Sequence, residues 1–248
     1  MKVEWKKGVS VQIEMAGVSD LGRVRKNNED FLLFDETLSL GIVCDGIGGR
    51  EGGEVASKLA AETMKDALRE APDNGLVSFL KAAGQKTNKA IIAVGEQNPT
   101  LYGMGTTMEC LLFRDKELYL THIGDSRTYL FHEGNFWQLT IDHNVRTLAF
   151  YGDIPEEMGK LAGGDALVRA LGIDKKAEVD VYTIKLVPGQ VFLTASDGLF
   201  DMIPDTDLAE MIAKGKHDKQ ALLQTLLAEA NKRGGNDNIT ALISQVIP

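Results

Sequence analysis

Short apolar runs recur along the whole chain and predict a protein with many β-strands. Nine segments either alternate between apolar and polar residues or are apolar throughout, which is typical of half-buried and fully buried strands. They are residues 11–18, 31–34, 38–44, 106–113, 117–123, 127–132, 179–186, 191–195 and 239–246. Arg114-Asp115-Lys116 and Glu133-Gly134-Asn135 are polar connectors of hairpin length. Connections this short indicate antiparallel pairing of the strands on either side.

Apolar residues spaced three and four positions apart predict two pairs of helices. The predicted helices cover residues 54–69, 76–94, 207–213 and 219–233. Thr206 and Asp218 are expected to cap the last two helices at their N-termini, and Gly234-Gly235 to end the last one. Helices that arrive in pairs between groups of hairpins favour a mixed α and β fold with antiparallel sheets rather than regular βαβ alternation.

The length and composition favour one domain. The chain has 248 residues, of which 44% are hydrophobic, enough for one large core. No Pro/Ser-rich linker, charge run, low-complexity tract or solenoid-type repeat divides it. Residues 144–165 fit neither period and contain several glycines and a proline. An irregular segment of this length in a compact domain is often a functional loop.

The charge balance excludes some classes of partner. The formal net charge of −9 argues against nucleic acid or an anionic membrane, because phosphate-rich partners select basic surfaces. No stretch reaches the roughly 18 apolar residues that a membrane span needs. The start, Met1-Lys2-Val3-Glu4-Trp5, lacks the apolar region of a signal peptide. We therefore expect a cytoplasmic protein whose two cysteines are reduced.

Acidic residues stand beside glycine or asparagine where several strands are expected to end or begin. The motifs are Asn27-Asn28-Glu29-Asp30, Asp45-Gly46, Gly124-Asp125-Ser126, Asp197-Gly198 and Asn236-Asp237-Asn238. Each alone is also a common turn. Brought together, however, the carboxylates would repel one another unless they are protonated or hold a hard cation. Oxygen ligands favour Mg²⁺ or Mn²⁺, and Cys44 and Cys110 lack the spacing of a soft-metal site.

An ordered series of motifs resembles the metal-dependent Ser/Thr protein phosphatases of type 2C, in their compact bacterial form. The resemblance runs from about residue 18 to residue 246, and the combination is far more specific than any one motif. The motifs are Ser19-Asp20-Leu21-Gly22-Arg23-Val24-Arg25-Lys26-Asn27-Asn28-Glu29-Asp30, Asp45-Gly46-Ile47-Gly48-Gly49, Gly53-Glu54-Val55-Ala56-Ser57, Gly105-Thr106-Thr107, Gly124-Asp125-Ser126-Arg127, Ser196-Asp197-Gly198-Leu199 and Gly235-Asn236-Asp237-Asn238-Ile239-Thr240.

This resemblance implies a fold, a reaction and partners. The fold would be α+β, a four-layer α-β-β-α sandwich with two central antiparallel β-sheets flanked by helices. Residues 1–248 would form a single phosphatase domain with an irregular flap at residues 144–165. The reaction would be hydrolysis of phosphoserine and phosphothreonine with two Mn²⁺ or Mg²⁺ ions and a weaker third. The partners would be phosphoproteins and a companion Ser/Thr kinase, and we expect a monomer.

The resemblance also implies a role for each matching residue. Asp45 would bridge the two ions and orient the attacking water, and Arg25 would bind the substrate phosphate. The other implied metal ligands are the Gly46 carbonyl, Asp30, Asp197 and Asp237, with Asp125 on the third ion and Glu29 and Asn238 at or just behind the ligands. Water between two divalent cations becomes acidic enough to attack a phosphoryl group, and only arginine offers a planar fork to two phosphate oxygens.

The sequence departs from the family pattern at several positions. Ile47 stands where many eukaryotic relatives carry a histidine proposed to protonate the leaving group, and Ile47 has no proton to give. Arg50 replaces the histidine that is usual in bacterial relatives, and the flap ends without the usual His-Pro. His143 belongs to a block that the family shares, and we interpret it as structural.

Three other readings remain open. Cys44 and Arg50 have the spacing of cysteine-dependent phosphatases, although Asp45 would raise the pKa of the thiol and repel phosphate. Ser126 invites a serine-hydrolase reading, but no convincing triad partner follows it. The third alternative is a catalytically silent phosphoprotein-binding regulatory module of the same fold, although nothing obvious in the acidic set has been lost.

Overall fold

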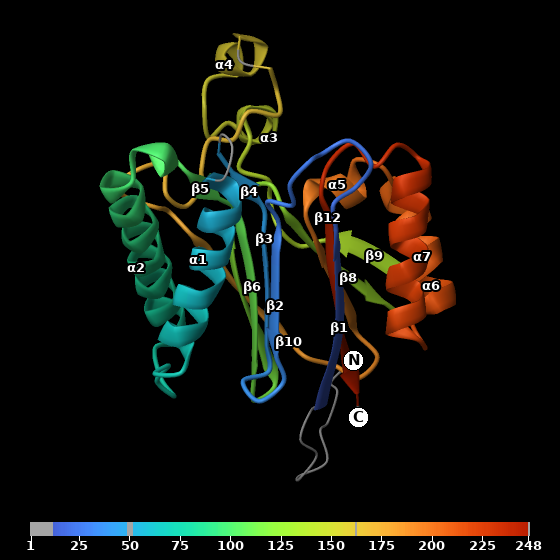
Figure 1. Ribbon diagram of the computed structural model, residues 1–248. Helices are drawn as coiled ribbons and strands as arrows, with labels where there is room; N and C mark the ends of the chain where they lie inside the picture. Colours follow the sequence, from blue (N-terminus) through green and yellow to red (C-terminus); the bar gives the residue numbers. More distant parts are fainter. Residues whose placement is uncertain (1–11, 49–51, 162, 248) are drawn as a thin grey trace.

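The computed structural model describes residues 12–48, 52–161 and 163–247. Its architecture is two five-stranded sheets packed face to face, with helices on both outer faces (Figure 1). The first sheet has the order β1 (Gln12–Asp20), β12 (Ile239–Ile247), β11 (Val191–Ala195), β8 (Arg127–His132), β9 (Asn135–Gln138). The second has the order β10 (Asp180–Lys185), β7 (Glu117–Ile123), β6 (Met108–Arg114), β3 (Leu40–Cys44), β2 (Phe31–Asp35). Every neighbouring pair is antiparallel, as the short connectors predicted.

Two long helices cover the second sheet and two shorter ones cover the first (Figure 1). The helices over the second sheet are α1 (Gly52–Leu68) and α2 (Leu76–Gln97). Those over the first sheet are α6 (Asp205–Gly215) and α7 (Lys219–Lys232), which follow the short α5 (Asp197–Phe200). Three short elements complete these layers. The strands β4 (Gly46–Ile47) and β5 (Gly105–Thr106) pair with each other, and η1 (Pro99–Leu101) is a 3-10 turn.

Three groups of buried apolar side chains lie between the four layers. One group fills the space between α1, α2 and the second sheet, and another lies between α5, α6, α7 and the first sheet. The third lies between the two sheets and includes Leu111, Phe192 and Leu242. All five residues of β3 and of β11 are buried, because each strand is covered on both faces, and this explains their uninterrupted apolar runs. The predicted four-layer sandwich is confirmed.

The structure changes two local expectations and confirms a third. Thr206 does not cap a helix, because α6 already begins at Asp205 with Pro204 at the N-cap. Asp218 does cap α7, where its Oδ1 accepts a hydrogen bond of 3.0 Å from the Ala221 amide. The region 135–138 forms the extra strand β9 rather than a plain connector. Its alternation is short and three of its four residues are exposed, so little apolar signal marks it.

The flap, residues 144–165, is predicted to be irregular but contains two short helices. They are α3 (Val145–Tyr151) and α4 (Glu156–Leu161). The Asn144 side chain caps α3 by accepting a hydrogen bond from the Thr147 amide, and Asn144 also pairs with Leu167 in an isolated antiparallel bridge. The flap therefore leaves and rejoins the body at one place, and α4 stands farthest out at the upper end of the molecule (Figure 1).

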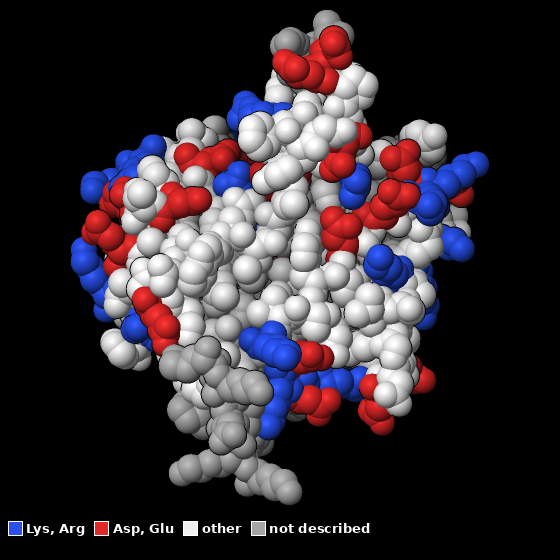
Figure 2. Space-filling model, turned by 180° about the vertical axis from the view of Figure 1, so that it is seen from behind, with Lys and Arg blue, Asp and Glu red and all other residues white. Residues whose placement is uncertain are grey.

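Basic and acidic side chains are mixed on the back face of the molecule, and neither sign dominates there. Lys and Arg side chains alternate with Asp and Glu there, and acidic side chains gather near the tip of the flap (Figure 2). Glu156 and Glu157 form the acidic first turn of α4. In the part of the chain that the structure describes, no helix is both long and apolar enough to cross a membrane.

Candidate active site

Asp45 stands at the end of the buried strand β3, and its backbone is tied to a neighbouring connection. The Asp45 amide donates to the Thr107 hydroxyl at 2.9 Å, and the Asp45 carbonyl accepts from the Thr107 amide at 2.9 Å. A Cβ at Gly46 would lie 2.2 Å from the Gly53 carbonyl oxygen. The glycine after Asp45 is therefore required by close packing against the start of α1.

Asp197 occupies a similar position at the end of the buried strand β11. It opens α5, and a Cβ at Gly198 would lie 2.1 Å from the Asn238 carbonyl oxygen. Gly198 thus lets the start of α5 rest on the Asp237-Asn238 turn. The two Asp-Gly motifs resemble turns in sequence, but neither glycine has a positive φ. In both motifs the close approach of another backbone segment is what excludes a side chain.

The remaining acidic residues reach the same edge of the two sheets from other strand ends. Asp30 precedes β2, Asp125 lies between β7 and β8, and Asp237 lies just before β12. In antiparallel sheets the end of one strand and the start of its neighbour share an edge, and this places these residues together. They surround a cleft of ≈ 370 Å³ whose lining includes the predicted site residues Arg25, Glu29, Asp45, Gly46, Asp125, Asp197, Asp237 and Asn238.

Asp30 lies behind this cleft rather than on its wall. Its side chain is only 7% exposed and its Oδ2 accepts a hydrogen bond of 2.6 Å from the Ser196 hydroxyl. The Asp45 carboxyl is within hydrogen-bonding reach of it. Burial raises the pKa of Asp30 to about 6.

The cleft carboxylates repel one another strongly. Burial, together with the charges of Asp30, Asp197 and Asp125, raises the pKa of Asp45 well above its usual value. Burial is also the main reason that the pKa of Asp197 rises to about 8 and that of Asp125 to about 6. Perturbed pKa values gathered in one cleft are a mark of a functional site.

One guanidinium group faces this acidic cluster. Arg25 donates from Nη2 to Asp237 Oδ2 at 2.5 Å, and its side chain is half exposed. Burial would lower the pKa of Arg25, but the neighbouring carboxylates, Asp237 foremost, raise it above its ordinary value. Arg25 thus enters the cleft from the solvent side as a permanent cation, in a position to meet an anionic ligand.

The chemistry of the donor set fits a divalent cation. The buried Asp197 Oδ1 has no hydrogen-bond partner in the described structure, although an orphaned carboxylate oxygen is costly to bury. Among residues 12–48, 52–161 and 163–247, no three His, Cys, Asp or Glu side chains are already arranged to hold an ion. Mg²⁺ and Mn²⁺ often keep several waters and take only one or two carboxylates each, so a looser arrangement of acids still fits them.

Glu29 and Asn238 hold the backbone of the site together. The Asn238 Oδ1 accepts from the Glu29 amide at 2.8 Å, and its Nδ2 donates to the carbonyls of Leu21 and Asn27. The Glu29 carbonyl accepts from the Gly46 amide at 3.1 Å and from the Ser57 hydroxyl at 2.7 Å. The Asn238 side chain therefore ties the loop that carries Arg25 to the start of β12.

Sequence reasoning did not select three residues that the structure places in or against the site. They are Thr107, Ser196 and Asp165: Thr107 fixes Asp45, Ser196 fixes Asp30, and Asp165 lines the cleft from the returning end of the flap. Thr107 and Ser196 stand inside recognised motifs, which was an available signal. Asp165 carries no local signal, since its place depends on how the flap folds back and on its ion pair with Arg146 at 3.1 Å.

The two nucleophile alternatives find no support in this geometry. Burial raises the pKa of the Cys44 thiol well above its usual value, whereas a nucleophilic cysteine needs a lowered one. Arg50, the other half of that motif, lies outside the described residues. Ser126 is fully buried and shares a hydrogen bond of 2.7 Å with the Thr107 hydroxyl.

Comparison with known proteins identifies the class of protein to which this fold and cleft belong. A model of the family described as protein phosphatase 2C matches residues 23–241, so the chain belongs to the protein phosphatase 2C family. A protein named "Serine/threonine phosphatase stp" from Listeria welshimeri is 34% identical over 234 residues, covering 91% of this chain and 92% of that protein. The predicted resemblance, and with it the class of enzyme, is confirmed.

Two solved structures of the phosphatase PstP resemble this chain closely. The crystal structure of the Mycobacterium tuberculosis protein has a TM-score of 0.84 and 35% identity, covering 96% of this chain and 100% of that one. The structure of the PstP catalytic domain in complex with two manganese ions has a TM-score of 0.83 and 35% identity, with the same coverage. The chain therefore has the fold of the bacterial phosphatases of this family.

Proposed function

We propose that this chain is a Ser/Thr protein phosphatase that hydrolyses phosphoserine and phosphothreonine with the help of two Mn²⁺ or Mg²⁺ ions. The observation that carries this proposal is the convergence of Asp45, Asp125, Asp197 and Asp237 with Arg25 in one cleft. The family match and the manganese complex of a relative with the same fold support it. We further propose that the whole chain acts as one phosphatase domain with the flap at residues 144–165.

The residues present would divide the two ions between them. Asp45 would bridge both, the Gly46 carbonyl would join it on one side, and Asp197 and Asp237 on the other. Asp30 would support Asp45 from behind, and Asp125 would hold a weaker third ion. When bound, the ions supply an acidified water as the nucleophile and offset the negative charge of the phosphoryl group.

The chain's own residues would bind and orient the substrate. Arg25 would donate from two of its nitrogens to two phosphate oxygens, since the guanidinium already reaches into the cleft. It must first release Asp237, its partner at 2.5 Å. Ile47 lines the cleft and has no proton to give, so the leaving alkoxide would take its proton from water or from another lining side chain.

The shape of the cleft fits a phosphorylated side chain on a protein surface. It is polar, open to solvent at Arg25 and bounded on one side by Asp165 at the base of the flap. A cleft of ≈ 370 Å³ admits a phosphoresidue without enclosing the protein that carries it. The partners would therefore be phosphoproteins, including targets of a companion Ser/Thr kinase, with a monomer as the active form.

A turnover assay with controlled metal tests this function. The purified protein should hydrolyse p-nitrophenyl phosphate and a phosphothreonine peptide with Mn²⁺, lose the activity in EDTA and regain it when Mn²⁺ or Mg²⁺ is restored. Full turnover in excess chelator would reject the metal-dependent reaction. No turnover of either substrate, with Mn²⁺ shown to be bound, would instead favour the silent phosphoprotein-binding module.

A further inference from the structure

His143 lies just before the flap and holds Gly124 from both sides. Its amide donates to the Gly124 carbonyl at 2.7 Å, and its Nδ1 accepts from the Gly124 amide at 3.1 Å. Gly124 has a φ of 110°, and a Cβ there would lie 2.5 Å from the Thr107 side chain. The next residue is Asp125. The direction in which Asp125 leaves β7 is therefore set by an unusual backbone conformation that one histidine stabilises.

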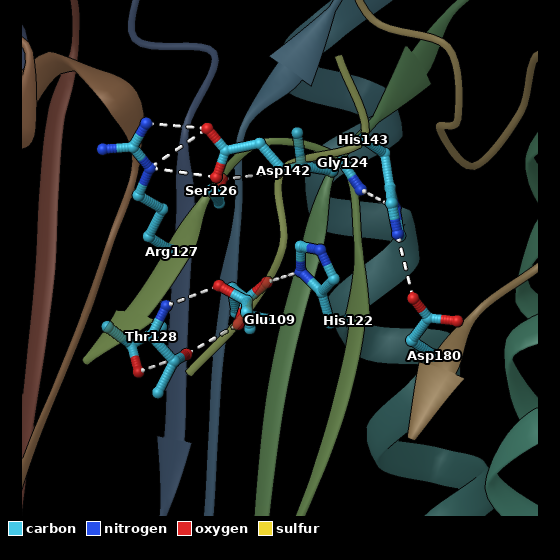
Figure 3. Close-up of polar contacts among 12 residues, drawn as sticks. Glu109, His122, Gly124, Ser126, Arg127, Thr128, Asp142, His143 and Asp180 are labelled. Atoms are coloured by element: carbon cyan, nitrogen blue, oxygen red, sulfur yellow. Dashed lines mark hydrogen bonds and ion pairs between the residues drawn. The ribbon is translucent and has the colours of Figure 1, made fainter. Parts of the chain in front are cut away.

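The hydrogen bonds fix the tautomer of His143. Nδ1 accepts from a backbone amide, so the ring proton lies on Nε2, which donates to Asp180 Oδ2 at 3.0 Å (Figure 3). The side chain of His143 is 1% exposed, and burial lowers the pKa of the ring. Asp180 on β10 thus keeps a neutral imidazole in the orientation that leaves its Nδ1 lone pair facing Gly124.

A second histidine supports the first from behind. The rings of His122 and His143 lie 4.5 Å apart between centroids. Both nitrogens of His122 face acceptors, the Glu109 carboxylate and the Ile141 carbonyl. Burial would lower the pKa of His122, but its ion pair with Glu109 raises it above the usual value. Glu109 therefore favours the protonated form of His122, and the positive charge of that form adds to burial in lowering the pKa of His143.

His143 also binds the returning end of the flap. Its carbonyl accepts a hydrogen bond of 2.7 Å from the Val168 amide, next to the bridge between Asn144 and Leu167. The Asp142 carboxylate just before it is held by the Arg127 guanidinium at 2.7 Å (Figure 3). The start of the flap, its end and the turn that carries Asp125 thus meet at one buried residue.

We propose that His143, oriented by Asp180, is a positioning residue that directs Asp125 into the acidic cleft and joins the Asp125 turn to the base of the flap. This rests on the proposed function, in which Asp125 holds the weaker third ion. The sequence alone favoured a structural role for His143. The geometry assigns it a narrower one, because its side chain contacts the backbone that aims a ligand rather than the cleft itself.

Mn²⁺ binding measures this role without relying on turnover. Residues that orient a metal ligand typically affect metal affinity by about 10- to 100-fold. We expect His143→Ala to weaken the Mn²⁺ site that Asp125→Ala also weakens, by about tenfold or more, and to leave the other sites unchanged in isothermal titration calorimetry. His143→Asn keeps a short acceptor for the Gly124 amide and should restore most of the affinity. His217→Ala, at an exposed histidine, is the matched control.

A double-mutant cycle separates positioning from general stability. If His143 acts through Asp125, His143→Ala should change Mn²⁺ binding little further in an Asp125→Ala background. Equal losses with and without Asp125 would overturn the proposal, as would unchanged Mn²⁺ binding in His143→Ala. An Asp125→Ala protein that binds Mn²⁺ like the unmodified protein would instead contradict the assignment of Asp125 within the proposed function.

Amide hydrogen exchange gives a readout in the metal-free protein. Loss of the Nδ1 acceptor should speed exchange of the Gly124 amide by about tenfold, the equivalent of one ordinary hydrogen bond, and His143→Asn should reverse most of this. If His143→Ala does not fold, Asp180→Ala tests the same link at a partly exposed position. It should weaken Mn²⁺ binding in the same direction, and no effect there would overturn the orienting role of Asp180.

Discussion

Two groups of buried charged side chains lie close to one edge of the sandwich, and they are built in opposite ways. Glu109 on β6 and His122 on β7 are cross-strand partners with no exposed side-chain surface. Both Glu109 oxygens are occupied, one by His122 and the other by the Thr128 hydroxyl at 2.6 Å (Figure 3). The Thr128 hydroxyl also shares a hydrogen bond with the Thr194 hydroxyl on the neighbouring strand. Every charge in this group has its partner within the chain.

The cleft group lacks such internal compensation. Asp45 is surrounded by other carboxylates, Asp197 keeps an orphaned oxygen, and the Arg25 guanidinium that pairs with Asp237 is half exposed. A buried charge that is fully paired needs no further partner, whereas a group of like charges is stable only when it is protonated or binds a cation. Whether buried charges are compensated within the chain therefore distinguishes a structural ion pair from a ligand site, even when both contain the same kinds of residue.

Neutralising one cleft carboxylate should produce the largest effect on activity and sharpen this comparison. Asp45→Asn should lower kcat/KM by at least about 1,000-fold, as the loss of a central electrostatic group typically does. The same change removes repulsion, so the metal-free protein should melt at an equal or higher temperature. Thermal melts in EDTA, beside assays in Mn²⁺, check both. A marked loss of metal-free stability would show that Asp45 is as well compensated as Glu109.

Neutralising Glu109, the paired carboxylate, should instead lower the stability of the protein. Glu109→Gln leaves His122 without its counter-charge in a fully buried place, and breaking such a pair costs about 3–5 kcal/mol in the free energy of unfolding. Urea denaturation measures it. Glu178→Gln is the matched control, because Glu178 pairs with Lys176 at 3.0 Å on the surface, where solvent screens the pair and its loss should change stability little. Similar losses in both variants would break the comparison.

The two groups also differ in how far the sequence reveals them. The cleft residues stand in motifs with glycine or asparagine at strand ends, so local patterns predicted Asp45, Asp125, Asp197 and Asp237, and an ordered resemblance added Arg25. The fold followed from hydrophobic period and connector length. Their roles as ligands stay predictions, but the structure does bring these side chains into one cleft.

Glu109 and His122 carry no such signal. They lie 13 positions apart in two strand segments that are largely apolar, and they meet only through the register of β6 and β7. The link between His143 and Gly124 depends in the same way on tertiary contact across 19 positions. Local patterns mark turns and strand ends, whereas pairs that depend on register become visible only in the folded chain.

The cleft carboxylates should make the metal-free protein less stable as the pH rises. The pKa of Asp30 and of Asp125 is raised to about 6 and that of Asp197 to about 8, chiefly by burial, against roughly 3.9 in an unfolded chain. The folded state therefore binds these protons more tightly, and the stabilisation is complete below the unfolded value and lost as the pH rises through 6 to 8.

Melting temperatures between pH 5 and pH 9, with and without Mn²⁺, check this expectation. The metal-free protein should become less stable as the pH rises, and Mn²⁺ should remove or reverse the trend, because the ions favour the ionised carboxylates. Asp197→Asn should flatten the metal-free profile, since it removes the group with the highest pKa among the three. A metal-free protein that gains stability across this range would show that the cleft charges are compensated after all.

Replacing Cys44 should have the smallest effect on activity, and it tests whether a buried thiol next to the site takes part in the reaction. It is the last residue of β3, directly before Asp45, and it packs in the apolar layer between α1 and the second sheet. Burial, with Cys110 and Asp30 nearby, raises the pKa of its thiol, so the thiol stays protonated and unreactive.

Cys44→Ser should therefore keep activity within about a few-fold while costing about 1–3 kcal/mol in stability, because a hydroxyl enters an apolar place. Turnover of p-nitrophenyl phosphate in Mn²⁺ and urea denaturation measure the two effects, with Cys110→Ser as the matched control in the same layer. If Cys44→Ser alone abolished turnover while Mn²⁺ still bound and the protein stayed folded, the nucleophile would be the thiol, and the uncompensated carboxylates would need another explanation.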